Sequence, residues 1–228
     1  MTAGRQAPPD GWAGAGGWAG AEAGRLDDAA VIRLSLADPE RFELLYQRHA
    51  PTIQRYVVRR LGPDAADDIV AETFLLAFRH RAGYDTARGN VLPWLYGIAT
   101  NLLGRHRRDE IRLYTALART GIDPVTAPFT DQVDERVTAT AASRRLAQAL
   151  AGLKAAYRDA LLLTAWGGLT YEETAAALGI PAGTVRSRIS RARADLRRTL
   201  GDLDPTSTAP ASTAATSTTA PTRTEETR

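Results

Sequence analysis

The sequence predicts an all-α protein of two small helical domains, joined by a flexible linker and flanked by disordered ends. Apolar residues recur at helical spacing in two blocks, and no stretch alternates between apolar and polar residues as a strand would. A segment with prolines and clustered acids separates the blocks. The predicted parts are a leader at 1–28, a first domain at 29–110, a linker at 111–140, a second domain at 141–203 and a tail at 204–228.

Composition excludes several classes of protein. The 228 residues include no cysteine, so disulfides, thiolate catalysis and cysteine-based zinc sites are excluded. The sequence has no apolar run of about 18 residues and no basic start followed by an apolar core, so we expect neither a membrane span nor a secretory signal. The simplest expectation is a cytoplasmic protein. Basic residues outnumber acidic ones by only 29 to 26, too few to indicate nucleic-acid binding without clustering.

Both ends of the chain are of low complexity. The leader is rich in Gly and Ala and repeats "GWAG", but its glycine spacing does not fit a dinucleotide-binding loop and no strand precedes it. The tail consists mostly of Thr, Ser, Ala and Pro without a periodic apolar face. We therefore expect both ends to be disordered.

Three main helices are predicted in the first block. The first has apolar and aromatic residues at helical spacing, namely Phe42, Leu45, Tyr46, His49, Ile53 and Tyr56. Gly62-Pro63 breaks that helix. The apolar positions of the next helix are Ile69, Val70, Phe74, Leu75 and Phe78. A third helix is expected over Asn90–Arg108, with the apolar residues Trp94, Leu95, Ile98, Leu102 and Leu103.

The second block ends in a predicted helix-turn-helix. Thr170 and Glu173 fit a capping box at the start of one helix. Gly179 stands at the predicted end of this helix, where a glycine in the left-handed conformation commonly forms the C-terminal cap. Pro181 is tolerated in the first turn of the next helix. A helix, a tight glycine turn and a second helix make the helix-turn-helix pattern.

The last helix combines an apolar seam with a basic surface. The seam consists of Val185, Ile189, Ala192 and Leu196. Polar and basic groups lie near or off the seam, as on a helix that reads DNA, namely Thr184, Arg186, Ser187, Arg188, Arg191 and Arg193. The alternative is a basic face that only meets solvent. Asp195 is the only acid of this helix, whereas a merely solvated helix more often mixes charges of both signs.

The helix expected over Asn90–Arg108 interleaves aromatic and basic residues. Trp94 and Tyr96 offer stacking surfaces for unpaired bases, and Asn101 can hydrogen-bond a base edge. Basic residues that would follow a nucleic-acid backbone come next, namely Arg105, Arg107 and Arg108. A place in the hydrophobic core is the alternative for both aromatics, and it is favoured for Tyr96.

Three motifs together resemble one known family. "WLYGIATN" with its basic run resembles the second conserved region of the extracytoplasmic-function (ECF) sigma factors. "DDIVAETFLLAFRH" (Asp67–His80) resembles their polymerase-binding helix, and Leu169–Leu200 resembles their fourth region. The resemblance covers about Ser35–Glu110 and Ala141–Leu200, and the motifs come in the family's order.

The resemblance implies a protein that binds core RNA polymerase and directs it to promoter DNA. Residues implied in docking on polymerase are Asp68, Glu72 and Thr73. Residues implied at the melted minus-ten element are Trp94, Asn101, Arg105, Arg107 and Arg108. Residues implied at the minus-thirty-five element are Thr184, Arg186, Ser187, Arg188 and Arg191. Many family members are held inactive by an anti-sigma factor, and the sequence shows no site that we can assign to one.

Some positions depart from the family's pattern. Gly97 stands where a basic residue is common, which puts one backbone contact in doubt. Gly152–Leu163 lacks a proline often found before the fourth region's second helix. The linker is longer than in the shortest members of the family.

Two other functions are less well supported by the sequence. A free-standing helix-turn-helix regulator that binds duplex DNA without polymerase would not need the acidic segment Asp67–Glu72. An enzyme is not expected, because His49, His80 and His106 fall on separate helices without a carboxylate at the spacing of a catalytic triad or a metal site. We expect no cofactor and no metal.

Overall fold

A computed structural model of the protein describes residues 26–120 and 133–200, and every regular element in these two ranges is helical. The prediction of an all-α fold is confirmed. The elements are α2 (Asp28–Ala37), η1 (Pro39–Phe42), α3 (Glu43–Leu61), α4 (Ala66–His80), η2 (Arg81–Gly83), η3 (Thr86–Arg88), α5 (Leu92–Leu103), η4 (Gly104–His106), α6 (Arg107–Thr120), α7 (Val133–Gly152), α8 (Ala155–Ala165), α9 (Tyr171–Leu178) and α10 (Ala182–Leu200).

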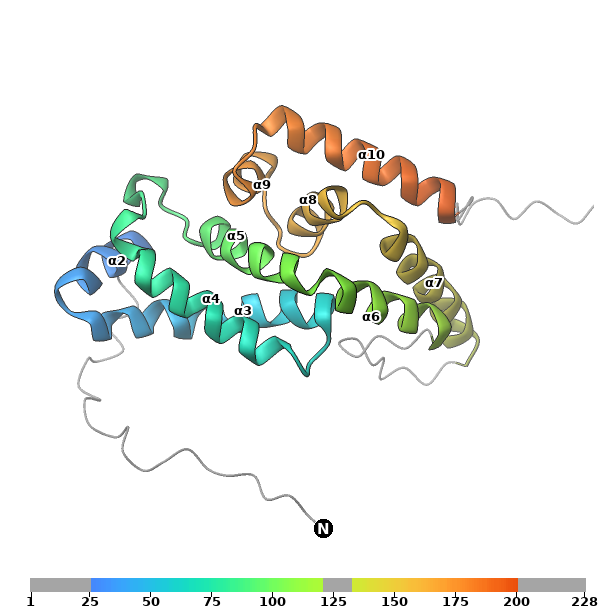
Figure 1. The fold of residues 1–228 in the computed structure, drawn as a ribbon, viewed down its shortest axis with the longest axis horizontal. Coiled ribbons are helices and arrows are strands. Elements are labelled where there is room, and N and C mark those ends of the chain that lie inside the picture. The colour runs from blue at the N-terminus through green and yellow to red at the C-terminus, as the bar shows by residue number, and fades with distance from the viewer. Residues whose placement is uncertain (1–25, 121–132, 201–228) are drawn as a thin grey trace, which may run out of the picture.

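The first block is built on α3, α4 and α5, which pack against one another (Figure 1). As predicted, α3 ends at Gly62, whose φ of 83° is a conformation that glycine adopts at little cost. Tyr56 of α3 and Tyr96 of α5 are buried and pack edge to face, with ring centroids 5.0 Å apart. Tyr96 is therefore a core residue, as the favoured interpretation had it.

The second block contains the predicted helix-turn-helix, formed by α9 and α10. The Thr170 hydroxyl accepts a hydrogen bond from the backbone N–H of Glu173, and the Glu173 carboxylate accepts one from the N–H of Thr170. Gly179 ends α9 in the left-handed conformation with φ 63°. Both end signals are confirmed, because each depends only on residues a few positions apart.

The limits of the predicted helices and core need three corrections. Tyr46 and Leu75 fit the apolar pattern, but their exposed fractions are 48% and 47%, because they lie where α3 and α4 face solvent. The helix expected to continue to Arg108 ends at Leu103. The tighter turn η4 begins at Gly104, a residue with poor helix propensity, and α6 begins after it.

Part of the segment 111–140, expected to be a linker, is helical. α6 continues to Thr120, α7 begins at Val133, and the two helices pack along each other. Residues 121–132 lie outside the described part of the chain, as do the leader up to residue 25 and the whole predicted tail. The predicted domain boundaries stay a prediction.

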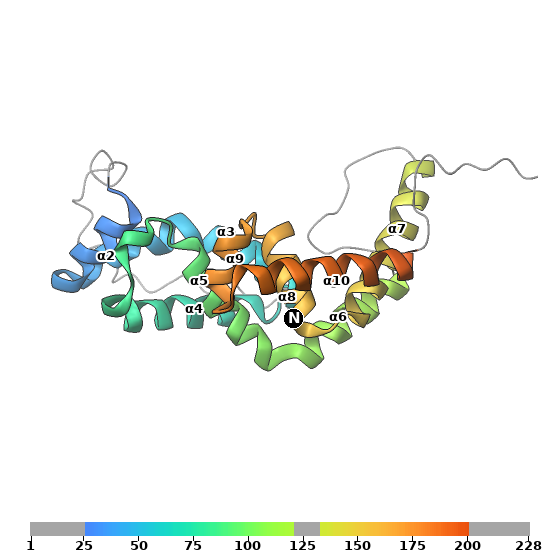
Figure 2. The same cartoon turned by 90° about the horizontal axis from the view of Figure 1, so that it is seen from above.

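The two blocks are in direct contact. α9 packs against α5, as the views in Figures 1 and 2 both show. Buried side chains of both blocks also belong to one hydrophobic cluster, among them Leu95 of α5 and Leu163 of α8. This contact determines which candidate functional residues are accessible.

Candidate nucleic-acid interface

α10 presents its basic residues away from the rest of the second block. Val185 and Ile189 are buried against α8 and α9, and they fix the orientation of the helix. Arg186 and Ser187 are exposed on its other side, while Arg188 is half-buried. The arrangement is that of a recognition helix, with an apolar back and a polar front that fits a DNA major groove.

Two of the predicted α10 contacts already have partners inside the protein. The Ser187 hydroxyl donates to the carbonyl of Thr184 at 2.9 Å, within the first turns of the helix. Arg191 donates to the Tyr157 hydroxyl of α8 at 3.2 Å. That hydrogen bond lowers the pKa of Tyr157, because the guanidinium stabilises the phenolate form. The bond orients Arg191 at the surface, and since Arg191 is exposed, it can exchange this bond for a contact to DNA.

α5 carries the candidate single-strand contacts on one side, which we call the outer face of α5 and define as Trp94, Gly97 and Asn101. These positions are three and seven residues apart and therefore lie on one side of the helix. Trp94 is half-buried and its ring lies against Tyr84, with centroids 4.8 Å apart. Asn101 is exposed, whereas Gly97 is buried. One side of Trp94 thus has an aromatic neighbour inside the protein, so stacking on a base would use its other side.

The basic run does not continue the outer face of α5. Arg105 lies in the turn η4, and Arg107 and Arg108 lie in the first turn of α6. All three are exposed. Arg105 donates to the Glu72 carboxylate of α4 at 3.1 Å, which joins a predicted DNA contact to a predicted polymerase contact. The ion pair is exposed and contributes little stability.

The predicted polymerase contacts on α4 fall into two groups. Asp68 is exposed and Glu72 is half-exposed. Thr73 is fully buried, and its hydroxyl donates to the carbonyl of Ile69 at 2.7 Å. Thr73 is therefore part of the core packing and not of the exposed face, a placement that depends on how α4 packs and not on the motif.

Sequence reasoning missed two residues beside Asp68 and Glu72. Leu75 is seven residues after Asp68 and three after Glu72, so it shares their side of α4. Tyr46 of α3 packs edge to face on Phe74 of α4, with ring centroids 4.9 Å apart, and stays half-exposed. The helical periodicity of apolar residues had predicted that Tyr46 and Leu75 are buried in the core. Exposed aromatic side chains are enriched at protein-binding surfaces, and such surfaces have a polar rim in which the two carboxylates could lie.

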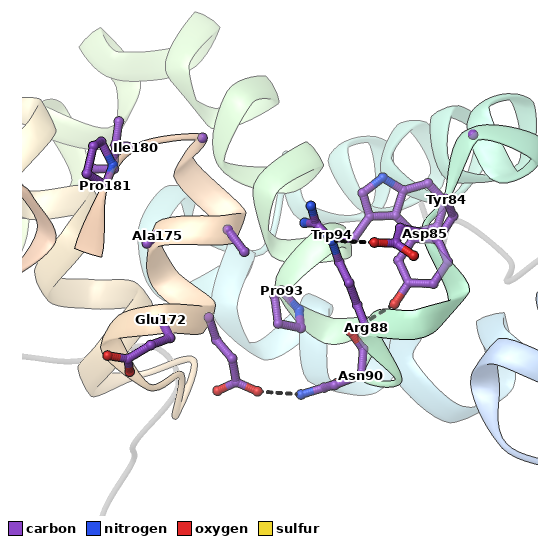
Figure 3. Close-up of a pocket in the computed structure, with 14 residues that line it drawn as sticks. Tyr84, Asp85, Arg88, Asn90, Pro93, Trp94, Glu172, Ala175, Ile180 and Pro181 are labelled. Carbon is purple, nitrogen blue, oxygen red and sulfur yellow. Dashed lines mark hydrogen bonds and ion pairs between the residues drawn. The ribbon is translucent and has the colours of Figure 1, made fainter.

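A cavity of about 830 Å³ lies between the loop before α5 and the helix α9 (Figure 3). Trp94 and Tyr84 line one side of it, and Glu172 and Glu173 line the other. The Asn90 side chain donates to the Glu173 carboxylate at 2.7 Å, and the Tyr84 hydroxyl donates to the Asn90 carbonyl at 3.0 Å. The backbone N–H of Thr170 and, after it, the Asn90 amide hold the pKa of Glu173 below its usual value, so the carboxylate is ionised at neutral pH.

Two family models match the chain. The model for sigma-70 region 2 matches residues 45–113, and the model for sigma-70 region 4 matches residues 143–196. SigL of Mycobacterium tuberculosis, an ECF RNA polymerase sigma factor, is 34% identical over 180 residues, which cover 78% of this chain and 99% of that protein. The chain belongs to the ECF sigma factors. The family named from the three motifs is confirmed.

Further similar proteins are also sigma factors. The RNA polymerase sigma factor CarQ of Myxococcus xanthus is 34% identical over 167 residues, covering 72% of this sigma factor and 91% of that protein. Two solved structures share its fold at 25% identity. CnrH bound to the cytosolic domain of CnrY has a TM-score of 0.52 and covers 76% of this chain and 96% of that one. Bartonella quintana RpoE bound to the anti-sigma factor NepR has a TM-score of 0.50 and covers 70% and 96%.

Region 2 therefore contains α3, α4, α5 and the start of α6, and region 4 contains the end of α7, α8, α9 and most of α10. The family acts in transcription initiation and is not a class of enzymes. Within residues 26–120 and 133–200 there is no cluster of three or more side chains that could hold a metal ion. The same residues include no helix that is both long and apolar enough to span a membrane.

Proposed function

We propose that this sigma factor divides promoter recognition between two surfaces. The outer face of α5 holds the melted minus-ten element, with Trp94 stacking on a base and Asn101 bonding to a base edge. Arg105 in the turn η4, with Arg107 and Arg108 in the first turn of α6, follows the backbone. The basic front of α10 reads the minus-thirty-five element in duplex DNA. The observation that carries this assignment is the exposed basic front of a helix whose apolar back is fixed by buried residues.

The polymerase docks on α4 and the neighbouring part of α3. Asp68 and Glu72 supply negative charge, and Leu75 and Tyr46 supply apolar surface beside it. A free-standing regulator would have no use for such a surface next to its DNA contacts. We therefore prefer a subunit of polymerase to a regulator that binds duplex DNA alone.

The energetics of melting also require a partner. Opening duplex DNA costs on average about 1.4 kcal/mol per step, so a bubble of roughly ten pairs costs on the order of 14 kcal/mol. Base stacking returns about 1–3 kcal/mol per base, and the outer face of α5 has a single aromatic side chain, the half-buried Trp94. The polymerase must supply the remainder.

A protein inhibitor is a further partner that we infer by similarity. The related CnrH and Bartonella quintana RpoE structures each hold a second protein, which in the RpoE structure is an anti-sigma factor. We infer that this sigma factor also has a partner of that class. A cytoplasmic location follows from the need to meet polymerase and promoter DNA.

The test is binding to purified bacterial core RNA polymerase. The double variant Asp68→Lys/Glu72→Lys should lose most of its affinity, because it replaces two carboxylates of the docking surface by cations. Asp38→Lys/Glu40→Lys is the matched control, since it makes the same change in charge at the turn between α2 and α3. Equal binding by both variants would show that the docking face is elsewhere. Failure of the wild type to bind polymerase, with binding to duplex DNA retained, would favour the free-standing regulator.

A further inference from the structure

We propose that Tyr157 of α8 is a positioning residue for promoter recognition, because it holds Arg191 of α10 in the orientation that reads the minus-thirty-five element. The inference rests on the proposed role of α10 and deepens it. Tyr157 contacts no base in this assignment and acts only through Arg191.

The hydrogen bond crosses between two packed helices. α8 and α10 lie against each other (Figure 1), and Ile189 of α10 is buried in one small apolar cluster with Ala160 of α8. Arg191 is two residues further along α10 and is exposed. Its Nη1 donates to the Tyr157 hydroxyl at 3.2 Å. A tyrosine on the supporting helix therefore sets the direction of a side chain on the reading helix.

The ring of Tyr157 is itself held in place. It is half-buried and packs against the main hydrophobic core, and the Lys154 ammonium lies 5.8 Å from the ring centroid. The backbone N–H of Tyr157 donates to the carbonyl of Lys154 at 2.9 Å, in the first turn of α8. A tyrosine has only two side-chain torsions, so fixing its hydroxyl costs little conformational entropy. The hydroxyl is thus a fixed acceptor for a long and flexible arginine side chain.

A buried ion cluster includes the two residues that follow Tyr157 in α8. The cluster consists of Arg158 and Asp159 of region 4 with Arg60 and Glu110 of region 2. Glu110 bonds to Arg60 at 2.6 Å and to Arg158 at 2.9 Å, and Asp159 bonds to Arg60 at 2.6 Å. The turn that carries Tyr157 is therefore anchored by charged groups on its inner side.

Arg158 also ties this turn to its own region. It donates from Nη1 to the carbonyl of Leu150 at 3.1 Å and to that of Leu153 at 3.2 Å, where α7 ends and α8 begins. Both bonds lie within region 4. They therefore hold the turn that carries Tyr157 independently of the contact with region 2.

Asp195 is the partner that Arg191 would otherwise take. It is the only acid of α10 and lies four residues after Arg191, a spacing that brings two side chains together on a helix. In the structure Asp195 pairs with Arg198. Arg191 lowers the pKa of Tyr157, and Asp195 is close enough to oppose that effect. An Arg191 side chain paired with Asp195 would be directed along α10 and partly neutralised, so it would no longer point at DNA.

Arg191 can keep its bond to Tyr157 while it contacts DNA. A guanidinium has five N–H donors in a planar fork, and the bond to Tyr157 takes one of them, at Nη1. The edge formed by Nε and Nη2 can then face the O6 and N7 acceptors of a guanine, which arginine binds in a bidentate manner. Tyr157 thus fixes the plane of the fork before DNA arrives, which lowers the entropy cost of binding.

The test is a double-mutant cycle in reconstituted holoenzyme, measured as the preference for a promoter with an intact minus-thirty-five element over one with that element scrambled. Arg191→Ala should lower the preference roughly tenfold, within the range for one bidentate contact. Tyr157→Phe removes only the hydroxyl and should lower it roughly threefold, as for the loss of one hydrogen bond. In the Arg191→Ala background Tyr157→Phe should have no further effect, since no arginine is left to position.

A second-site change separates positioning from a merely structural role. Tyr157→Phe/Asp195→Asn should regain most of the preference that Tyr157→Phe loses, because the competing carboxylate is gone. A general loss of stability would not respond to Asp195→Asn in this way. Tyr96→Phe is the matched control, because it removes a tyrosine hydroxyl from the core of region 2 and should leave the preference unchanged.

Each failure has its own signature. Wild-type preference in Tyr157→Phe, with a loss in Arg191→Ala, would overturn the positioning role and keep the proposed function of α10. An equal loss from Tyr157→Phe with and without Arg191 would also overturn it, since the tyrosine would then act by another route. Without recovery in Tyr157→Phe/Asp195→Asn, the part assigned to Asp195 would be wrong. An unchanged preference in Arg191→Ala would reject the proposed role of Arg191 itself, and the positioning role with it.

Discussion

The two helices proposed to contact DNA are presented in opposite ways. α10 is fixed from behind by Val185 and Ile189, and its basic front faces outward. The outer face of α5 lies under α9, with Gly97 buried against a neighbouring backbone. The surface for duplex DNA is thus open to solvent, whereas the surface for single-stranded DNA is partly covered, with Trp94 half-buried and Asn101 exposed. The difference teaches that exposure alone identifies the helix proposed for duplex DNA, whereas the role of α5 has to be inferred from the types of its residues.

The largest effect is expected where the two regions are joined. Glu110→Gln removes the carboxylate that bonds to both Arg60 and Arg158. Removing one partner of a buried ion pair costs about 3–5 kcal/mol, and we expect about 3–4 here, because each arginine keeps other partners. The measurement is the free energy of unfolding in urea.

The neighbouring residue is the control for this prediction. Asp109 is exposed and pairs with Arg112 at the surface, so Asp109→Asn should change stability by less than about 0.5 kcal/mol. Equal losses for Glu110→Gln and Asp109→Asn would show that the cluster does not hold the two regions together.

A smaller effect is expected for the exposed basic front of α10. Arg188→Ala/Arg191→Ala removes two groups from the front of α10, and good bidentate contacts to bases are worth about 1–3 kcal/mol each. We expect holoenzyme to lose about 2–3 kcal/mol of preference for a promoter with an intact upstream element over one with that element scrambled. Arg193→Ala/Arg197→Ala removes the same charge further along the helix and should weaken both promoters alike. If Arg188→Ala/Arg191→Ala left the promoter preference unchanged, α10 would not be the helix that recognises the upstream sequence.

The smallest effect is expected for the outer face of α5. Trp94→Ala should weaken holoenzyme binding to a single-stranded minus-ten oligonucleotide by about 1–2 kcal/mol, the lower part of the range for one stacked base, because Tyr84 already lies against one side of the ring. Tyr96→Phe is the control on the same helix, because Tyr96 is buried away from the outer face. It should leave binding unaffected. Equal binding by Trp94→Ala and wild type would mean that stacking on this ring does not contribute.

Signals that depend on near neighbours in the chain were predictable from the sequence. The capping box of Thr170 and Glu173, the glycine end of α9 and the break at Gly62 each depend on a few adjacent residues. The apolar seam of α10 was predictable too, because one helix with one buried side must repeat its apolar residues at helical spacing.

Features that depend on packing between distant segments were not predictable. Tyr46 and Leu75 fit an apolar pattern and are half-exposed, while Thr73 is buried within a surface motif. Glu110 lies 48 residues from Arg158 along the chain, so no local pattern links the two. Charged residues are mostly exposed, and a sequence-based prediction therefore places both at the surface. Gly97 was recognised as a departure from the family's pattern, but only the position of Ala177 on α9 explains why a glycine fits there.

The even division of charge in the buried cluster has a consequence for ionic conditions. The cluster of Arg60, Glu110, Arg158 and Asp159 holds two positive and two negative charges, so the cluster itself should add little salt dependence to the contact between the regions. Binding of α10 to DNA releases counterions and must weaken steeply as salt rises. Of these two contacts, the one between α10 and upstream DNA should therefore be the more sensitive to salt.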